Sequence, residues 1–155
     1  MEIVMRPIGI IHSPYTKKED APIQGAFEPD ARGEVEVFAE FEEGLKDIEG
    51  FSHLILLYHF DRAGDVKLVR PTFLDDSPHG ILACRHPCRP NGIGISIVRL
   101  LRREGRILHV AEIDVLDGTP LLDIKPYVPS FDCRPDAASG WIQGKERRPK
   151  PPGRE

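Results

Sequence analysis

The amino-acid sequence predicts an all-β, mainly antiparallel fold: a compact β-barrel with a few short helices. Several segments have the length and composition of β-strands. None of them is followed by a long amphipathic helix, which disfavours the alternating βαβ arrangement of a parallel sheet. A length of 155 residues is sufficient for one domain with its own hydrophobic core.

The first half of the chain is expected to hold three strands and one short helix. The strands are predicted at Arg6–His12, Glu34–Val37 and Leu54–Tyr58, with a polar loop over Lys17–Asp30 and a helix over Phe41–Asp47. The second strand alternates polar and apolar residues, which is typical of a half-buried strand. The third is a continuous apolar run, which indicates a central strand buried on both faces.

The second half of the chain adds four predicted strands and a tail. The strands lie at Gly80–Cys84, Gly94–Leu101, Ile107–Val115 and Leu121–Ile124. The segment Arg102–Arg106, between the second and third of these, is the clearest hairpin signal in the chain. Beyond Asp132 the sequence becomes proline-rich, basic and polar. We therefore expect a barrel domain over 1–132 and a tail over 133–155 that is largely disordered at its end.

The composition indicates a soluble, cytoplasmic protein without a membrane segment. The first residues, Met1–Arg6, lack the basic start and the long apolar region of a signal peptide. No apolar run approaches the ~20 residues needed to cross a bilayer. Three cysteines cannot form a complete set of disulfides, which favours a reducing compartment.

The charge pattern leaves two interpretations open. A net charge of −4 argues against binding nucleic acid through overall charge. Between Arg85 and Arg106, however, six arginines accompany a single acid, Glu104. This basic stretch could contact a phosphate backbone, and a solvated hairpin surface explains it about equally well.

The run Arg85–Ser96 is the most informative part of the sequence. It contains two arginines, two prolines and two glycines within an apolar, strand-like region, a combination that indicates a ligand site. Its Gly92-Ile93-Gly94 portion follows a Pro-Asn turn instead of opening a helix, so a Rossmann dinucleotide site is rejected. A zinc site formed by Cys84, His86 and Cys88 is disfavoured, because their spacing is not that of a zinc knuckle.

A second informative run, Asp114–Tyr127, places three aspartates around an Asp-Gly turn. The first two, Asp114 and Asp117, are candidate catalytic carboxylates. Asp117 has an alternative role, because an aspartate before glycine stabilises a turn without any function. Asp123 and Lys125 would form an ordinary same-face pair on a strand.

Together with Pro7–Tyr15, Ala21–Gln24 and Glu49–Leu54, these two runs are similar to the motifs of the TsaA-like family. The resemblance covers residues 6–132. The best-known members of that family methylate the N6-threonylcarbamoylated adenosine beside the tRNA anticodon, with S-adenosylmethionine as the methyl donor. The resemblance also implies a β-barrel and a homodimer.

The resemblance implies the following site residues. The S-adenosylmethionine contacts would be Pro22, Gln24, Gly25, Asp61, Arg62, Arg85, Ile95, Asp114, Leu116, Asp117 and Gly118, and the tRNA contacts Arg89, Asn91, Lys125 and Tyr127. Asp114 or Asp117 would assist deprotonation of the substrate nitrogen. Arg85 is the expected anion partner, with a structural salt bridge as its alternative. His53, at the start of an apolar run, is more simply explained as a strand-entry histidine.

The sequence departs from the family pattern at three positions and in its length. Ile23 replaces the usual arginine, Gly92 the usual proline, and Asp61 a frequent histidine. Bacterial members carry an additional C-terminal domain, where this chain has a short tail. The leading hypothesis is therefore a tRNA methyltransferase, and the alternative is a non-catalytic S-adenosylmethionine- or nucleotide-binding module that acts through a partner. The arginine hairpin at Arg99, Arg102, Arg103 and Arg106 is expected to contact tRNA phosphates.

Overall fold

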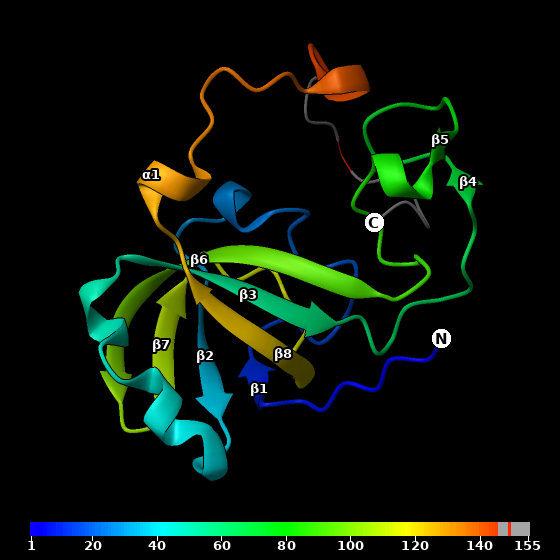
Figure 1. Ribbon diagram of the computed structural model, residues 1–155. Helices are drawn as coiled ribbons and strands as arrows, with labels where there is room; N and C mark the ends of the chain where they lie inside the picture. The colour runs from blue at the N-terminus through cyan, green and yellow to red at the C-terminus, as the bar shows by residue number, and fades with distance from the viewer. Residues whose placement is uncertain (146–148, 150–155) are drawn as a thin grey trace. The chain divides into compact units, whose positions relative to one another are not determined.

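The computed structural model describes residues 1–145 and residue 149. Within that part of the chain, six antiparallel strands close into a barrel in the order β1-β2-β7-β6-β3-β8 (Figure 1). The strands are β1 (Gly9–His12), β2 (Arg32–Val37), β3 (His53–His59), β6 (Ile93–Glu104), β7 (Ile107–Ala111) and β8 (Thr119–Pro126). The predicted fold class, a mainly antiparallel barrel with a few short helices, is confirmed.

The chain divides into two compact units. The first comprises Met1–Asp61 and Ile93–Tyr127 and contains the barrel, and the second comprises Arg62–Gly92 and Val128–Glu155. The first also holds the short 3₁₀ helices η1 (Gly25–Phe27), η2 (Ala39–Leu45) and η3 (Ile48–Gly50). The second holds β4 (Val69–Arg70), β5 (His79–Gly80), η4 (Ile81–Ala83), α1 (Pro129–Asp132) and η5 (Gly140–Ile142). The sequence-based boundary at residue 132 stays a prediction.

The core of the first unit is the interior of the barrel, which takes alternate residues from every strand. On β3, Leu54, Leu56 and Tyr58 are buried, whereas Ile55 and Leu57 face outward and are half-buried. The expectation that this strand is buried on both faces was wrong, because in this barrel only one face of each strand meets the core. Further core side chains are Ile11, Val35, Val37, Val98, Leu108, Val110, Ile113 and Leu121.

The hairpin predicted around Arg102–Arg106 is present, with a longer first strand and a shorter turn. Glu104 of β6 pairs with Ile107 of β7, which leaves a two-residue turn in which Gly105 has a φ of 60°. A positive φ is readily adopted by glycine. The next strand ends at Ala111 and not at Val115, because Glu112 has a φ of 66°, which is incompatible with a continuing strand.

Other sequence-based boundaries needed correction. The strand expected over Gly80–Cys84 was wrong: β5 ends at Gly80 and the 3₁₀ helix η4 follows. Here Ile81 is buried while Leu82 is 79% exposed, so the apolar run contributes one anchor and not a buried strand. The helix expected over Phe41–Asp47 is the 3₁₀ helix η2, and the first strand begins at Gly9 instead of Arg6.

In the second unit, part of the predicted tail packs against β5. The Trp141 ring stacks on His79 with centroids 3.7 Å apart, and its Nε1 donates a hydrogen bond to the Ala83 carbonyl oxygen at 2.8 Å. Lys145 forms an ion pair with Asp75, which also binds His79. The chain is therefore attached to this unit as far as Lys145, and the disorder predicted for the end of the tail lies outside the described residues. No helix in the described ranges is long and apolar enough to cross a membrane.

Candidate functional site

The carboxylate of Asp114, just after β7, joins two segments that are distant in sequence. Its Oδ2 accepts a hydrogen bond from the Gly25 amide of η1 at 2.9 Å. Its Oδ1 accepts a hydrogen bond from the Ser96 hydroxyl of β6. The structure thus brings together two of the predicted cofactor residues, Gly25 and Asp114, and attaches both to the barrel wall.

Gly25 lies against the backbone of the segment that carries Asp114. A Cβ at this position would stand 2.9 Å from the Glu112 carbonyl carbon and closer still to its oxygen. Any side chain here would force the two segments apart, since real Cβ atoms do not approach other atoms this closely. The absence of a side chain at Gly25, and not backbone freedom, is what allows this contact.

The Asp117 turn is held by the segment that follows β1. Ser13 donates its amide to Asp117 Oδ1 at 3.1 Å and its hydroxyl to the Val115 carbonyl oxygen. The amides of Asp117 and Gly118 donate back to Tyr15 and Ile11, each at 2.8 Å. Gly118 has a φ of 82°. These contacts support the turn-forming alternative for Asp117, although its side chain is still 45% exposed and accessible to a ligand.

The pKa of Tyr15 responds to the negative charges of the same region. Burial raises the pKa of its phenol above the usual value, and the charges of Glu28 and Asp114 act in the same direction. The phenol is therefore neutral at physiological pH, as an ordinary tyrosine is, and can donate a hydrogen bond. The Asp114 region therefore combines fixed carboxylates with neutral donors.

The remaining predicted residues of the first unit are distributed along the barrel. Lys125 pairs with Asp123 at 3.0 Å, as the structural alternative predicted. Tyr127 packs edge-on against His53, with ring centroids 6.3 Å apart. Ile95 lies on the outer face of β6, opposite the inward-facing Ser96, so its side chain does not join the Asp114 contacts. Four others lie in connecting segments: Pro22 and Gln24 before η1, Asp61 after β3, and Leu116 before β8.

The first part of the Arg85–Ser96 run, Arg85–Gly92, belongs to the second unit, where it forms a loop after η4, and the rest of the run lies in β6. Arg85 is exposed, as are Arg62 and Asn91. Arg89 donates to the Cys84 carbonyl oxygen at 2.7 Å, which closes the loop on itself. His86 accepts a hydrogen bond from the Cys88 amide at 3.1 Å. The described residues contain no group of three side chains placed to hold a metal ion.

The hairpin arginines are largely engaged within the barrel unit. Arg102 pairs with Glu104 at 2.8 Å, and Arg106 lies 3.4 Å from Glu36. The pKa of Glu36 is lowered, first by its hydrogen bond to His12 and also by Arg106. Arg103 donates to the carbonyl oxygens of Gly105 and Leu45 and to Glu49. These contacts favour an ordinary hairpin surface, and contact with tRNA phosphates stays a prediction.

We expect Arg103→Ser to lower the free energy of unfolding by about 1–2 kcal/mol, because the variant loses hydrogen bonds to two carbonyl oxygens. The matched change Arg102→Ser removes an exposed ion pair and should cost less than about 0.5 kcal/mol. Urea denaturation of both variants measures the difference. Equal effects would show that Arg103 does not anchor the hairpin.

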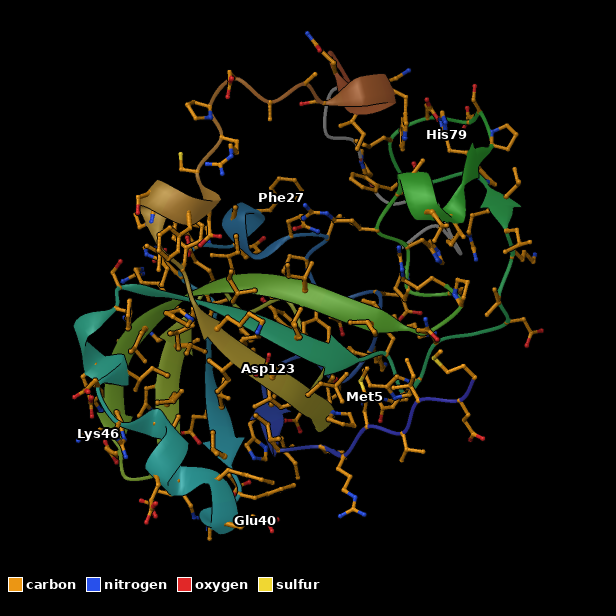
Figure 2. All side chains as sticks on the ribbon, in the orientation of Figure 1. Met5, Phe27, Glu40, Lys46, His79 and Asp123 are labelled. Atoms are coloured by element: carbon orange, nitrogen blue, oxygen red, sulfur yellow. The ribbon has the colours of Figure 1, made fainter. Side chains whose placement is uncertain are left out.

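A separate groove lies near the opposite end of the barrel from η1. It has a volume of about 500 Å³ and is lined by η2, η3 and parts of β8. Figure 2 shows Phe27 of η1 at one end of the barrel, and Glu40 of η2 with Lys46, the residue after η2, at the other. None of the predicted cofactor or tRNA contacts lines this groove.

Sequence reasoning missed three residues that build the Asp114 region: Ser13, Tyr58 and Ser96. Ser96 carried a usable signal. It occupies an inward position of an alternating strand, between Gly94 and Val98, where a polar side chain needs a partner. Ser13 gave no such signal because it lies outside a strand, and Tyr58 gave none because a tyrosine at an inward position is compatible with an apolar core.

Fold and site together define an antiparallel β-barrel protein whose candidate site is built around a carboxylate after β7. The chain belongs to the family described as the tRNA-methyltransferase O N-terminal domain, whose profile matches residues 10–133. The resemblance to TsaA-like proteins is therefore confirmed at the level of the family.

Several relatives are similar over most of this chain. A protein of Pyrococcus abyssi named "Probable S-adenosyl-L-methionine-binding protein" is 56% identical over 141 residues, which cover 91% of this chain and 77% of that protein. The Escherichia coli K12 protein named tRNA (adenine(37)-N6)-methyltransferase is 36% identical over 146 residues, covering 88% of this chain and 62% of the enzyme. A crystal structure of TrmO is similar with a TM-score of 0.80 and 43% identity, over 90% of this chain and 64% of that one. This chain thus spans less than two thirds of the TrmO protein of known structure.

Proposed function

We propose that this protein is an S-adenosylmethionine-dependent tRNA methyltransferase that acts on N6 of the threonylcarbamoyladenosine next to the anticodon. The observation that carries the proposal is the junction of Gly25 with Asp114, because it attaches the residue that follows the Ala21–Gln24 motif to the Asp114–Tyr127 motif. Relatives named S-adenosyl-L-methionine-binding protein and tRNA (adenine(37)-N6)-methyltransferase support it. The cytoplasm, where tRNA is modified, is the proposed location.

The groups around Asp114 suit a nucleoside cofactor. The carboxylates of Asp114 and Asp117 are acceptors for ribose hydroxyl groups, and a Cβ added at Gly118 would meet no atom within 4 Å, so a ligand can approach the backbone there. We assign Pro22, Gln24 and Leu116 to the same cofactor on the family resemblance. Ile95 is assigned to it through its backbone, because its side chain lies on the outer face of β6. Bound S-adenosylmethionine supplies an electrophilic methyl group. The residues around Asp114 would hold the accepting nitrogen close to that methyl group, within the reach of about 3–3.5 Å that a productive approach needs.

Removal of the proton from the substrate nitrogen falls to Asp117 more readily than to Asp114. Both oxygens of Asp114 accept hydrogen bonds from Gly25 and Ser96. Such bonds stabilise the charged carboxylate and weaken it as a base. Asp117 accepts the Ser13 amide through Oδ1, and its side chain is 45% exposed, so we assign the base to Asp117 and positioning to Asp114.

The tRNA contacts proposed from the resemblance are Arg89, Asn91, Lys125 and Tyr127. A single-stranded anticodon loop offers unstacked bases and phosphates, which suit aromatic and cationic side chains better than a broad basic surface. This agrees with a chain whose net charge is −4.

A homodimer is part of the proposal. The outer face of β6 exposes Ile93, Ile95 and Ile97, and the last two pair with Leu57 and Ile55 of β3. A contiguous apolar surface of this kind is typical of an interface. We expect light scattering to report a dimer at micromolar concentration, and Ile97→Lys, which places a charge in this surface, to shift it toward monomer. A wild-type monomer with full activity would contradict the dimer.

Arg85 is proposed to make a charged contact with the cofactor. Replacing it by alanine should weaken S-adenosylmethionine binding by about 1.5–3 kcal/mol, the range for a hydrogen bond to a charged group. Calorimetric titration measures the change, with Arg99→Ala as the control for loss of one arginine elsewhere. Unchanged affinity in a folded Arg85→Ala protein would remove Arg85 from the site.

Transfer of a radiolabelled methyl group to total tRNA separates the enzyme from its alternative, a non-catalytic S-adenosylmethionine- or nucleotide-binding module that acts through a partner. An enzyme labels the tRNA without any added protein. A protein that binds S-adenosylmethionine by calorimetry but transfers no methyl group, even at high concentration, would favour the binding module.

A further inference from the structure

A line of hydrogen bonds runs through the barrel wall to the candidate site. The Tyr58 hydroxyl lies 2.8 Å from the Ser96 hydroxyl, and the Ser96 hydroxyl binds Asp114. Tyr58 is 5% exposed and Ser96 is 3% exposed, so neither hydroxyl has free access to water. Asp114 in turn binds the Gly25 amide. We call these four residues the Tyr58 chain.

The Tyr58 chain has a fixed direction. An ionised carboxylate only accepts hydrogen bonds, so Ser96 donates its single proton to Asp114. Ser96 must then accept from Tyr58, and the phenol is the donor of that bond. Each group therefore orients the next, from the core to the carboxylate.

Gly94 makes room for the first member of the Tyr58 chain. It stands directly opposite Tyr58 in the β3–β6 pairing, two residues before Ser96. A Cβ at Gly94 would stand 2.6 Å from Tyr58 Cζ and 2.8 Å from Phe60 Cζ. The glycine lets the Tyr58 ring lie across β6, so that its hydroxyl reaches Ser96. Phe60 packs edge-on against the Tyr58 ring, with the ring centroids 5.4 Å apart.

We infer that Tyr58 and Ser96 are positioning residues for the S-adenosylmethionine site. They hold Asp114 in one rotamer, and through it they hold the Gly25 amide and the Gln24 segment against the barrel. The inference rests on the proposed function, because the ligand is the one proposed above. It also gives Gly94 a role that is distinct from ligand contact.

The test uses Tyr58→Phe, Ser96→Ala and the double variant. Ser96→Ala should weaken S-adenosylmethionine binding about tenfold, since Asp114 loses its orienting donor, and Tyr58→Phe should weaken it about threefold. Because the Tyr58 hydroxyl donates to Ser96, the effects of the two single changes on the affinity should be less than additive in the double variant. Without cofactor, the Gly25 amide should exchange with deuterium faster in Ser96→Ala than in the wild type, as followed by NMR.

The matched control is Val98→Ala, on the same inward face of β6 and fully buried. It should lower the thermal midpoint but change the affinity by less than about twofold, because it is not part of the Tyr58 chain. Wild-type affinity and an equally protected Gly25 amide in Ser96→Ala would overturn the inference, as would full additivity in the double variant. Tyr58→Phe keeps the ring packing and serves if Ser96→Ala does not fold. If the wild type fails to bind S-adenosylmethionine, the proposed function is wrong, while Gly25 exchange still tests the positioning.

Discussion

Gly25→Ala should abolish measurable S-adenosylmethionine binding and lower the free energy of unfolding by roughly 2 kcal/mol or more, as steric strain against a backbone does. The added methyl would stand 2.9 Å from the Glu112 carbonyl carbon and nearer to its oxygen, so η1 must move outward. Moving η1 also breaks the hydrogen bond from the Gly25 amide to Asp114. Calorimetry and urea denaturation measure the two effects.

Gly50→Ala is the matched control for that variant. Gly50 also lies in a 3₁₀ helix, η3, but a Cβ there would meet no atom within 4 Å. The free energy of unfolding of the Gly50→Ala variant should change by no more than about 0.5 kcal/mol, as for an ordinary surface substitution. If both variants bind S-adenosylmethionine normally, the close approach of η1 to Glu112 has no functional role.

Asp114→Ala is the second change with a large expected effect. It leaves the Ser96 hydroxyl and the Gly25 amide without the acceptor they share, and each unsatisfied donor costs about 1–3 kcal/mol. We expect both stability and S-adenosylmethionine affinity to fall, the latter by more than about tenfold. Asp114→Asn keeps one carbonyl oxygen and should be intermediate.

Asp123→Ala provides the comparison, because it removes a carboxylate whose partner, Lys125, is exposed. The Asp123–Lys125 ion pair should contribute at most about 1 kcal/mol to the free energy of unfolding. Thermal unfolding and calorimetry of the three variants distinguish a general loss of charge from a specific loss at Asp114. An Asp114→Ala protein with wild-type affinity would exclude Asp114 from the site.

The strands that alternate in polarity were predicted well from sequence, because a barrel wall with one buried face imposes that alternation. The hairpin at Gly105 was equally clear, since it combines a turn glycine with two flanking strands. Gly80–Cys84 was misassigned because a short apolar run has no period that separates a strand from a 3₁₀ turn. The early end of β7 was not predictable either, because it depends on the positive φ of Glu112, and a glutamate gives no indication of such a backbone angle.

The candidate site was accessible from sequence only in part. Family resemblance pointed to both Gly25 and Asp114, and the structure joins them. The supporting hydroxyls of Ser13, Tyr58 and Ser96 depend on which strands become neighbours when the barrel closes. Ser13 and Val115, for example, are 102 residues apart in the chain. Such pairings follow from strand register, which the sequence constrains only through the alternation of each strand.

The central claim is the transfer of a methyl group from S-adenosylmethionine to threonylcarbamoyladenosine in tRNA. The most direct measurement uses two tRNA pools, one carrying the threonylcarbamoyl modification and one from cells that lack it. Each is incubated with the purified protein and labelled S-adenosylmethionine, then digested to nucleosides and analysed by mass spectrometry. We predict label only in the first pool, in a nucleoside heavier than threonylcarbamoyladenosine by one methyl group. Equal labelling of both pools, or labelling of neither while the protein binds S-adenosylmethionine, would contradict the account.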